Sequence, residues 1–256
     1  MLIENTLFGT KDKVKNAIKQ LKELELSEGY YLAFSGGKDS CVIKALADMA
    51  KVKYDAHYNV TGIDPIELTR FIKKEHPDVI WDKPEIGFYR RLVKNGYPTR
   101  QFRWCCKLLK EGGGENRFVI TGVRAAESSK RAKRKNIEFC FRNTGKRYLN
   151  LIIDWTDQDV WNFIKQNNLP YCSLYDEGWE RIGCLMCPMN SHRIEHAKRY
   201  PKVVKAFKTA FKKRYEYCQE RGLTSAERFK DGDDMFDHWL YGEKKNIEVD
   251  QTVMFE

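Results

Sequence analysis

Phe34-Ser35-Gly36-Gly37-Lys38-Asp39-Ser40 is the stretch of sequence that decides the fold. It follows a short apolar run, Tyr30–Phe34, and precedes a helical pattern, Cys41–Ala50. This order predicts a strand, a tight glycine turn and the start of a helix. Two adjacent glycines lack Cβ atoms, so the backbone N–H groups of the turn can close on an anion. We therefore expect a phosphate-binding loop at the end of this strand.

The side chains of the loop also suit a nucleotide. The helix N-terminus adds N–H donors and partial positive charge, while Ser35 and Ser40 add hydroxyls and Lys38 a point charge. Asp39 can hold a Mg²⁺ ion that bridges phosphates. The G-x-x-x-x-G-K-[ST] spacing of a Walker loop is absent. An ordinary strand-to-helix turn is the alternative, but so many useful residues at one junction favour a nucleotide site.

Composition limits the class of protein. The chain has 256 residues, 42% of them apolar, and its net charge of +10 favours anionic partners such as nucleotides, sulfate esters or nucleic acid. A merely basic surface would give the same total. The sequence shows neither an apolar run of membrane-spanning length nor a signal-peptide core, so we expect a cytoplasmic protein without a membrane partner. Eight cysteines in that compartment favour metal binding or redox chemistry over disulfides.

Strand and helix patterns alternate through the first two thirds of the chain. Further strands are predicted at Val52–Val60, Val79–Trp81, Phe118–Gly122 and Leu149–Ile153, and helices at Ile66–Glu75, Phe88–Lys94 and Asp157–Gln166. This alternation predicts an α/β fold, an open, mostly parallel twisted sheet with helices on both faces. Gly112–Gly114 is expected to be a flexible linker before the strand at Phe118.

The remaining segments are predicted to be helical. Residues 1–29 carry apolar residues at helical spacing, which suggests a cap on the sheet. Beyond Pro170 the strand signal stops, and helices are expected at Arg193–Arg221 and Thr224–Trp239. We predict an α/β domain at residues 1–190 and a helical extension at residues 191–256 packed on it.

Ligands in such sheets bind beyond the carboxyl ends of the strands. Thr61 and Gly62 follow the second predicted strand, and Gly122 to Arg124 follow the fourth. Together with Ser35, Gly36, Gly37 and Ser40, we expect Thr61, Gly62 and Gly122 to contact the nucleotide.

Four cysteines form a second candidate site. Cys105 and Cys106 are adjacent, and Cys184 and Cys187 form a C-x-x-C turn that places two thiolates on one side of a loop. Three interpretations remain open from the spacing: partly buried thiols without metal, a [4Fe–4S] cluster on all four, or zinc. A zinc site would use Cys184 and Cys187 with His192 and His196, and would leave Cys105 and Cys106 unexplained.

The run Lys130-Arg131-Ala132-Lys133-Arg134-Lys135 is the strongest local concentration of charge. It fits a nucleic-acid or polyphosphate patch beside the site, and it fits a solvated loop equally well.

The order of these motifs resembles the sulfonucleotide (phosphoadenylylsulfate and adenylylsulfate) reductase family of PP-loop nucleotide α-hydrolases. The resemblance covers residues 30–190 and includes the PP-loop, the paired cysteines, Gly122-Val123-Arg124 with Glu127-Ser128, an Asp-Trp-Thr helix start and Ile-Gly-Cys-x-x-Cys. It implies an adenine nucleotide α-hydrolase-like fold and a [4Fe–4S] cluster on Cys105, Cys106, Cys184 and Cys187. It also implies that Arg124 faces phosphate or sulfate.

Two departures from the family pattern bear on the reaction. Reductases carry a cysteine in a Glu-Cys-Gly-Leu-His type tail that attacks the sulfate sulfur, whereas residues 249–256 hold no such motif. The last cysteine, Cys218, lies in a helical pattern and is expected to pack in a core. Reductases also have a degraded PP-loop, whereas this loop is intact, as in the ATP-using sulfurtransferases of the DNA phosphorothioation type. A smaller departure is Val60-Thr61-Gly62, where the family has Asp-Thr-Gly.

The resemblance implies adenylation-dependent sulfur transfer, with ATP or a related adenine nucleotide, Mg²⁺ and a [4Fe–4S] cluster as cofactors. Lys38, Asp39 and Arg124 are the expected catalytic residues. A sulfonucleotide reductase that releases sulfite with an external thiol is the alternative. A second alternative is a non-catalytic nucleic-acid-binding subunit with a structural metal. A nucleic-acid substrate, or a partner protein that supplies sulfur or electrons, fits the leading interpretation, and oligomerisation stays open.

Overall fold

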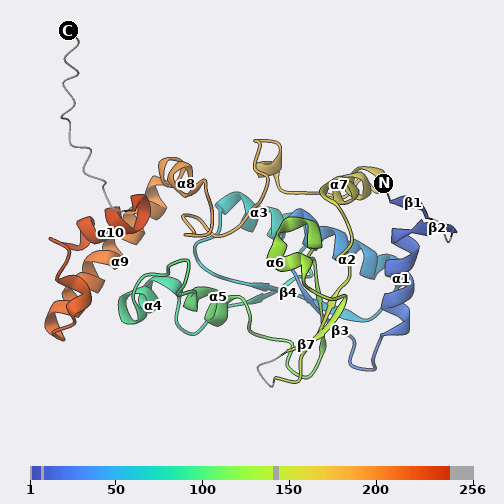
Figure 1. Ribbon diagram of the computed structural model, residues 1–256, viewed down its shortest axis with the longest axis horizontal. Helices are drawn as coiled ribbons and strands as arrows, with labels where there is room; N and C mark the ends of the chain where they lie inside the picture. The colour runs from blue at the N-terminus through green and yellow to red at the C-terminus, as the bar shows by residue number, and fades with distance from the viewer. Residues whose placement is uncertain (1, 7–8, 141–143, 243–256) are drawn as a thin grey trace, which may run out of the picture. The chain divides into compact units, whose positions relative to one another are not determined.

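A computed structural model describes residues 2–6, 9–140 and 144–242 (Figure 1). The chain forms two compact units: residues 1–85 with 105–184, and residues 86–104 with 185–256. No helix in the described part of the chain has the length and apolar content needed to cross a membrane.

The first unit holds both sheets. Its strands are β1 (Ile3–Thr6), β2 (Gly9–Asp12), β3 (Tyr30–Ala33), β4 (Tyr54–Asn59), β5 (Ile80–Asp82), β6 (Phe118–Thr121), β7 (Ile137–Phe139) and β8 (Arg147–Asn150). Its helices are α1 (Lys13–Glu23), α2 (Lys38–Ala50), α3 (Ile66–Glu75), α6 (Ser129–Ala132) and α7 (Asp157–Gln166), with short 3₁₀ turns at η1 (Ala125–Glu127) and η2 (Ser173–Tyr175). Helix α5 (Trp104–Leu109) begins at the boundary between the units.

The main sheet has the strand order β5-β4-β3-β6-β8-β7. All neighbouring pairs are parallel except β7 with β8, so the predicted α/β fold with a mostly parallel sheet is confirmed. From β3 the chain builds β4 and β5 on one side and then β6 and β8 on the other. The carboxyl end of β3 is therefore the switch in strand order, where such sheets bind ligands.

Apolar side chains from β3, β6, α2 and α3 form the core of this unit. Leu32, Val42, Leu46, Ile72 and Ile120 are completely buried. Helix α2 packs against both α1 and α7, which ties the N-terminal helix to the far half of the sheet. This arrangement holds the loop after β3 between rigid elements.

A buried ion pair joins the N-terminal segment to α7. The Lys13 ammonium lies 2.7 Å from Asp159 Oδ2, and the two side chains are 2% and 0% exposed. Asp159 also accepts hydrogen bonds from the backbone and hydroxyl of Thr156, the N-cap of α7. Thr156 and Asp159 therefore form a capping box at the start of α7.

Several predicted boundaries are wrong. The strand expected at Leu149–Ile153 lies earlier, at β8, because its last residues form the turn that leads to α7. The predicted helical N-terminus begins with two short antiparallel strands, β1 and β2, before α1. The antiparallel edge strand β7 lies directly after the basic run and was not expected from the sequence.

The second unit is helical. It contains α4 (Phe88–Asn95), α8 (Arg193–Arg199), α9 (Pro201–Glu220), η3 (Thr224–Ala226) and α10 (Gly232–Tyr241). Pro201 at the first turn of α9 separates it from α8, so the single helix predicted at Arg193–Arg221 is two helices. The predicted Thr224–Trp239 helix is also divided, because Asp231 caps a new helix.

An aromatic core holds this second unit together. Phe207 of α9 lies between Phe88 of α4 and Trp239 of α10, at centroid distances of 5.4 and 5.2 Å. The Trp239 indole donates a hydrogen bond to the Pro98 carbonyl at 2.7 Å. Cys218 is buried in α9, as expected for a packing residue.

The glycine segment before β6 is a fitted part of the first unit, and the flexible linker expected there is not observed. Gly113 and Gly114 have positive φ values of 71° and 69°. A Cβ atom on Gly113 would lie 2.4 Å from the Tyr31 hydroxyl, and one on Gly114 would lie 2.7 Å from Val119. Both positions therefore require glycine, for backbone conformation and for space.

We expect Gly113→Ala to lower the free energy of unfolding by more than about 1 kcal/mol, because alanine is strained at this φ and collides with Tyr31. Gly112→Ala is the matched control, since its Cβ would lie 4.0 Å from the nearest side-chain atom. Its free energy of unfolding should stay within about 0.5 kcal/mol of that of the original chain. Urea unfolding of both variants measures the difference. Equal stabilities would show that this segment is a linker after all.

Candidate functional site

The loop between β3 and α2 is shaped by Gly36. Its φ is +73°, and a Cβ atom there would lie 2.7 Å from Leu68 and Ile72 of α3. The glycine lets the backbone turn tightly against α3 and start α2 at Lys38. The predicted strand, glycine turn and helix start are therefore confirmed.

Two buried cations meet at the end of this loop. The side chains of Lys38 and Arg124 are 7% and 4% exposed. Arg124 Nε donates to Asp39 Oδ1 at 2.6 Å. Asp157 Oδ1 lies 3.1 Å from Lys38 Nζ and 3.0 Å from Arg124 Nη2. The three predicted catalytic residues thus share one cluster, to which Asp157 adds a fourth member.

Gly122 allows this cluster to form. A Cβ atom at Gly122 would lie 3.0 Å from Asp39 Cβ and 3.1 Å from the Asp39 carbonyl oxygen. Because no side chain intervenes, the residues after β6 approach the first turn of α2 closely, and Arg124 reaches Asp39. Gly122 is placed where it was predicted, beside the loop.

Lys38 is fixed from several sides. Its ammonium donates to the Glu180 carbonyl at 3.0 Å and lies 5.2 Å from the centre of the Tyr175 ring and 5.9 Å from that of Trp161. Its backbone N–H donates to the Tyr175 hydroxyl at 3.0 Å. Tyr175 therefore holds one of the donors expected to face an anion.

The hydroxyls of the loop bond mainly within it. Ser40 Oγ donates to the Gly37 carbonyl at 2.8 Å and lies 3.3 Å from Ser35 Oγ, while Ser35 is exposed. At the end of β4, Thr61 donates to Asp64 at 2.7 Å and is buried, whereas the space around the Cβ position of Gly62 is open. Gly62 can thus approach a ligand, and the Thr61 hydroxyl orders its own turn.

The Asp39 carboxyl titrates above its ordinary range. Burial raises its pKa, and the charges of Arg124 and Lys38 reduce that rise without cancelling it. A bound metal cation would favour the ionised form of Asp39 further. Asp39 is therefore chemically suited to meet a metal ion.

The cysteines divide by exposure. Cys105, Cys106, Cys184 and Cys187 are all partly exposed, whereas Cys41, Cys172 and Cys218 are buried. Lys110 hydrogen-bonds Cys184 and lies within electrostatic range of Cys106. Desolvation would lower the pKa of Lys110, but the thiolates and Asp64 outweigh it and raise the pKa. The Lys110 ammonium thus interacts with a thiol of the Cys105-Cys106 pair and with a thiol of the C-x-x-C turn.

The cysteine side chains do not form a metal geometry as they stand. Among the described residues, no group of three or more His, Cys, Asp or Glu side chains is arranged to hold a metal ion. Of the zinc alternative, His196 is buried, and its Nδ1 lies 3.4 Å from the Met186 backbone N–H. Desolvation lowers the pKa of His196.

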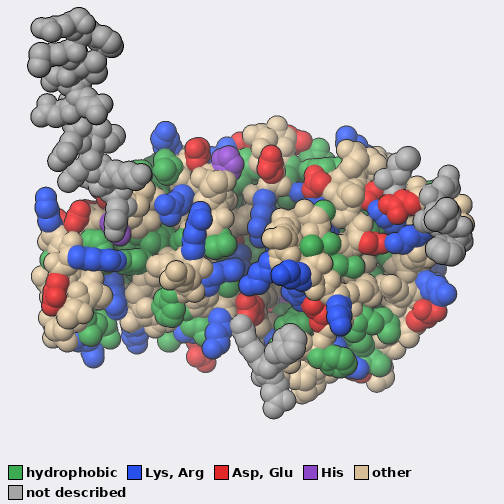
Figure 2. Space-filling model, viewed as in Figure 1, with side chains coloured by type: hydrophobic (Ala, Val, Ile, Leu, Met, Phe, Trp, Pro, Cys, Tyr) green, Lys and Arg blue, Asp and Glu red, His purple; other side chains and the backbone are tan. Residues whose placement is uncertain are grey.

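The basic run is partly neutralised. Arg131 pairs with Glu127, and Arg134 pairs with Glu138 at the start of the short strand β7. Lys130, Lys133 and Lys135 are exposed. Figure 2 shows Lys and Arg side chains over α6 with acidic side chains among them. Both interpretations of this run stay open as predictions.

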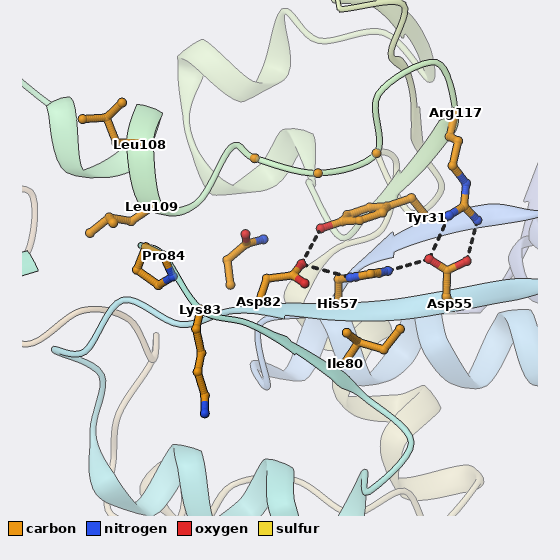
Figure 3. A pocket seen from close by; sticks show the side chains of 14 residues that line it. Tyr31, Asp55, His57, Ile80, Asp82, Lys83, Pro84, Leu108, Leu109 and Arg117 are labelled. Carbon is orange, nitrogen blue, oxygen red and sulfur yellow. Dashed lines mark hydrogen bonds and ion pairs between the residues drawn. The ribbon is translucent and has the colours of Figure 1, made fainter. Parts of the chain in front are cut away.

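Apart from the loop site, a second candidate site is a cleft of about 560 Å³ on one face of β3, β4 and β5 (Figure 3). We call it the second cleft. His57 lies between two carboxylates, with Nδ1 2.9 Å from Asp82 and Nε2 2.5 Å from Asp55. Arg117 binds both oxygens of Asp55 at 2.5 and 2.8 Å. Tyr31 donates to Asp82 at 3.2 Å and stacks on His57 with centroids 4.2 Å apart.

This network is unusual for its position. β4 is an interior strand, and interior strands of parallel sheets are normally apolar on both faces. Here Asp55, His57 and Asn59 alternate along one face, while Ala56 and Tyr58 are buried on the other. The alternation is visible in the sequence, but reading Val52–Val60 only as a strand missed it. Asp157, Tyr175 and Glu180 were also missed, since none belongs to a glycine-rich or cysteine motif.

Comparison with known proteins identifies the family. Residues 29–190 match the phosphoadenosine phosphosulfate reductase domain, well over half of the chain, so the chain belongs to this family. It is 33% identical to an uncharacterized protein of Methanocaldococcus jannaschii over 90% of this chain and 61% of that protein, and 29% identical to a second over 82% and 45%. The chain thus spans about half to three fifths of the length of these two relatives.

Other similar proteins carry names. The adenosine 5′-phosphosulfate reductase of Oceanobacillus iheyensis is 30% identical over 55% of this chain and 60% of that protein. Among solved structures, phosphoadenylyl-sulfate reductase from Candida auris aligns over 72% of this chain and 98% of its own, with 19% identity and a TM-score of 0.49. FMN adenylyltransferase from Candida glabrata aligns over 68% of this chain and 63% of its own, with 16% identity and a TM-score of 0.49.

The acidic network of the second cleft predicts a pH dependence. Desolvation alone would raise the pKa of Asp55, but Arg117 and His57 outweigh it and hold the pKa below its ordinary value. A lowered pKa in the folded state stabilises the protein above the unfolded-state pKa of about 3.9, and this stabilisation is lost as the pH falls further. The stability cost of Asp55→Asn should therefore be largest at pH 7 and shrink below about pH 4.

Urea unfolding at pH 7, 4 and 3 measures this cost. Asp78→Asn is the control, since the Asp78 side chain is 54% exposed and its pair with Lys44 at 3.0 Å is expected to contribute little to stability. A cost of Asp55→Asn that is the same at all three pH values would contradict the assignment.

Proposed function

We propose that this chain is a PP-loop enzyme that binds ATP and takes part in adenylation-dependent sulfur transfer. The observation that carries the proposal is the convergence of buried Lys38 and Arg124 on one point beside the loop, at the switch in strand order. Two buried cations at a glycine-shaped helix start suit a polyphosphate.

The proposed first step is attack by an acceptor oxygen on the α-phosphorus of ATP. A new P–O bond forms, the bond to the β-phosphate oxygen breaks, and pyrophosphate leaves with the electron pair. Lys38 and Arg124 stabilise the charge that develops on the phosphates. A sulfide-level sulfur nucleophile then attacks the acceptor atom that bears the adenylated oxygen, the bond from that atom to the oxygen breaks, and AMP leaves with the oxygen, so sulfur replaces oxygen without a change of oxidation state.

Mg²⁺, when bound, would neutralise phosphate charge, and Asp39 is the residue proposed to hold it. Asp39 already lies against Arg124 and is only partly exposed, so its carboxylate is positioned at the phosphate end of the site.

The loop supports ATP over a sulfonucleotide. Ser35, Gly36, Gly37, Asp39 and Ser40 are all present, and an intact loop suits the pyrophosphate group of ATP, whereas a sulfonucleotide has no β-phosphate to hold. The adenosine 5′-phosphosulfate reductases among the relatives support the alternative, a reductase that releases sulfite with an external thiol.

We further propose that Cys105, Cys106, Cys184 and Cys187 hold a [4Fe–4S] cluster, which would supply electron-transfer or sulfur chemistry when bound. Partial exposure of all four thiols, and the position of Lys110 beside Cys184 and Cys106, support this assignment. The second alternative, a nucleic-acid-binding subunit with a structural metal, rests on the exposed lysines of residues 130–135.

Asp39→Ala should reduce pyrophosphate release from ATP by about 10²–10³-fold, because the site loses its proposed metal ligand, while the iron content stays unchanged. The assay supplies DNA, tRNA and sulfide as candidate acceptors and donor. Asp78→Ala removes a distant surface carboxylate and should leave turnover intact. Unchanged turnover in Asp39→Ala would remove the metal role, and sulfite release from adenosine 5′-phosphosulfate without pyrophosphate release would favour the reductase.

Protein purified without oxygen should contain close to four iron atoms and four sulfides per chain, as a single [4Fe–4S] cluster requires. Cys106→Ser should lose most of this iron, because three thiolates hold the cluster poorly. Cys140→Ser is the matched control, since Cys140 is also partly exposed but lies outside the ligand set. One zinc per chain without iron would contradict the cluster and favour the site at Cys184 and Cys187.

A further inference from the structure

Asp157 neutralises the two buried cations of the nucleotide site. Its Oδ1 atom lies 3.1 Å from Lys38 Nζ and 3.0 Å from Arg124 Nη2. The side chains of Lys38 and Arg124 are 7% and 4% exposed, whereas that of Asp157 is 58% exposed. One oxygen from a solvent-facing side chain thus bridges two cations that are otherwise buried.

The two cations stay in place without Asp157. Lys38 is held by the Glu180 carbonyl and the Tyr175 ring. Arg124 is held through Nε by Asp39 at 2.6 Å. Removal of Asp157 would therefore leave both cations directed at the same point.

The backbone of Asp157 is also fixed. Asp157 is the first residue of α7, directly after the N-cap Thr156, and the capping box to Asp159 holds this turn. Lys13 anchors Asp159 from the N-terminal segment. Rotation of the exposed side chain alone is then enough to free the two cations, because no backbone movement is needed.

We propose that Asp157 is an internal counter-anion, which a polyphosphate must displace to bind, and that it thereby sets the affinity and charge selectivity of the site. The proposal rests on the proposed nucleotide function and adds a specificity-determining residue to it. A phosphate oxygen that bridges Lys38 and Arg124 would occupy the position of Asp157 Oδ1, and two anions cannot share it. The apparent affinity equals the intrinsic affinity multiplied by the fraction of molecules in which Asp157 leaves the two cations free.

The exchange also selects for charge. A ligand with a single negative charge replaces one carboxylate by one equivalent anion and gains little. Pyrophosphate and the triphosphate of ATP carry several charges, so they gain attraction to both cations beyond what the carboxylate provides. Asp157 therefore lowers the affinity for every anion by the same factor, so only ligands that bind both cations strongly, such as polyphosphates, still bind appreciably.

The test is isothermal titration of inorganic pyrophosphate, ATP and inorganic phosphate into the whole chain and into Asp157→Asn. Asparagine keeps the size of the side chain but removes the competing charge. We expect pyrophosphate and ATP to bind about tenfold more tightly to Asp157→Asn, with and without Mg²⁺, and inorganic phosphate to gain by about the same factor.

Asp154→Asn is the matched control. Asp154 belongs to the same connection between β8 and α7, but it pairs with Lys11 at 2.5 Å rather than with the two cations. The Asp154→Asn variant also removes one negative charge near the start of α7, so its affinities for the three ligands should equal those of the original chain. Thermal unfolding checks that both variants are folded.

Three outcomes would overturn the inference. Equal affinities in Asp157→Asn and the original chain would show that Asp157 does not compete. Weaker binding only in the presence of Mg²⁺ would make Asp157 a metal ligand. Absence of binding in both proteins at millimolar pyrophosphate and ATP would overturn the proposed nucleotide site as well, which separates the two failures.

Discussion

The close approach of Gly122 to Asp39 is the constraint on which the candidate site depends. The carboxyl ends of β3 and β6 lie side by side in the sheet, but side chains after the strands would normally keep the following segments apart. With no Cβ at Gly122, the segment after β6 meets the first turn of α2, and Arg124 reaches Asp39. The contact of Arg124 with Asp39 follows from this approach, and Asp157 joins Arg124 to Lys38.

Local signals predicted the centre of this arrangement well. The glycines, lysine and aspartate of residues 36–39 have requirements that only a strand-to-helix turn satisfies, and the Thr156–Asp159 cap marks the start of α7. Even the convergence of Gly122 and Arg124 on the loop follows from parallel strand order. These features depend on short-range stereochemistry or on a general property of parallel sheets.

The rest depended on tertiary contacts that a pattern does not contain. The edge strand β7 has three residues, two of them exposed, so its pairing with β8 rather than its composition makes it a strand. The break between α8 and α9 was readable from Pro201, but a continuous apolar pattern concealed it. Asp157 looked like an ordinary acidic residue in the first turn of a helix, and only the fold brings Lys38 and Arg124 to it.

The second unit is built from two separate stretches of chain, and this has a consequence for its synthesis. Helix α4 packs on α9, yet 80 residues of the other unit, Cys105–Cys184, lie between them in sequence. During translation the apolar side of α4, with Phe88 and Leu92, leaves the ribosome long before Phe207 exists to cover it. The first unit can therefore complete its sheet first, while α4 remains an exposed apolar segment that chaperones are suited to shield.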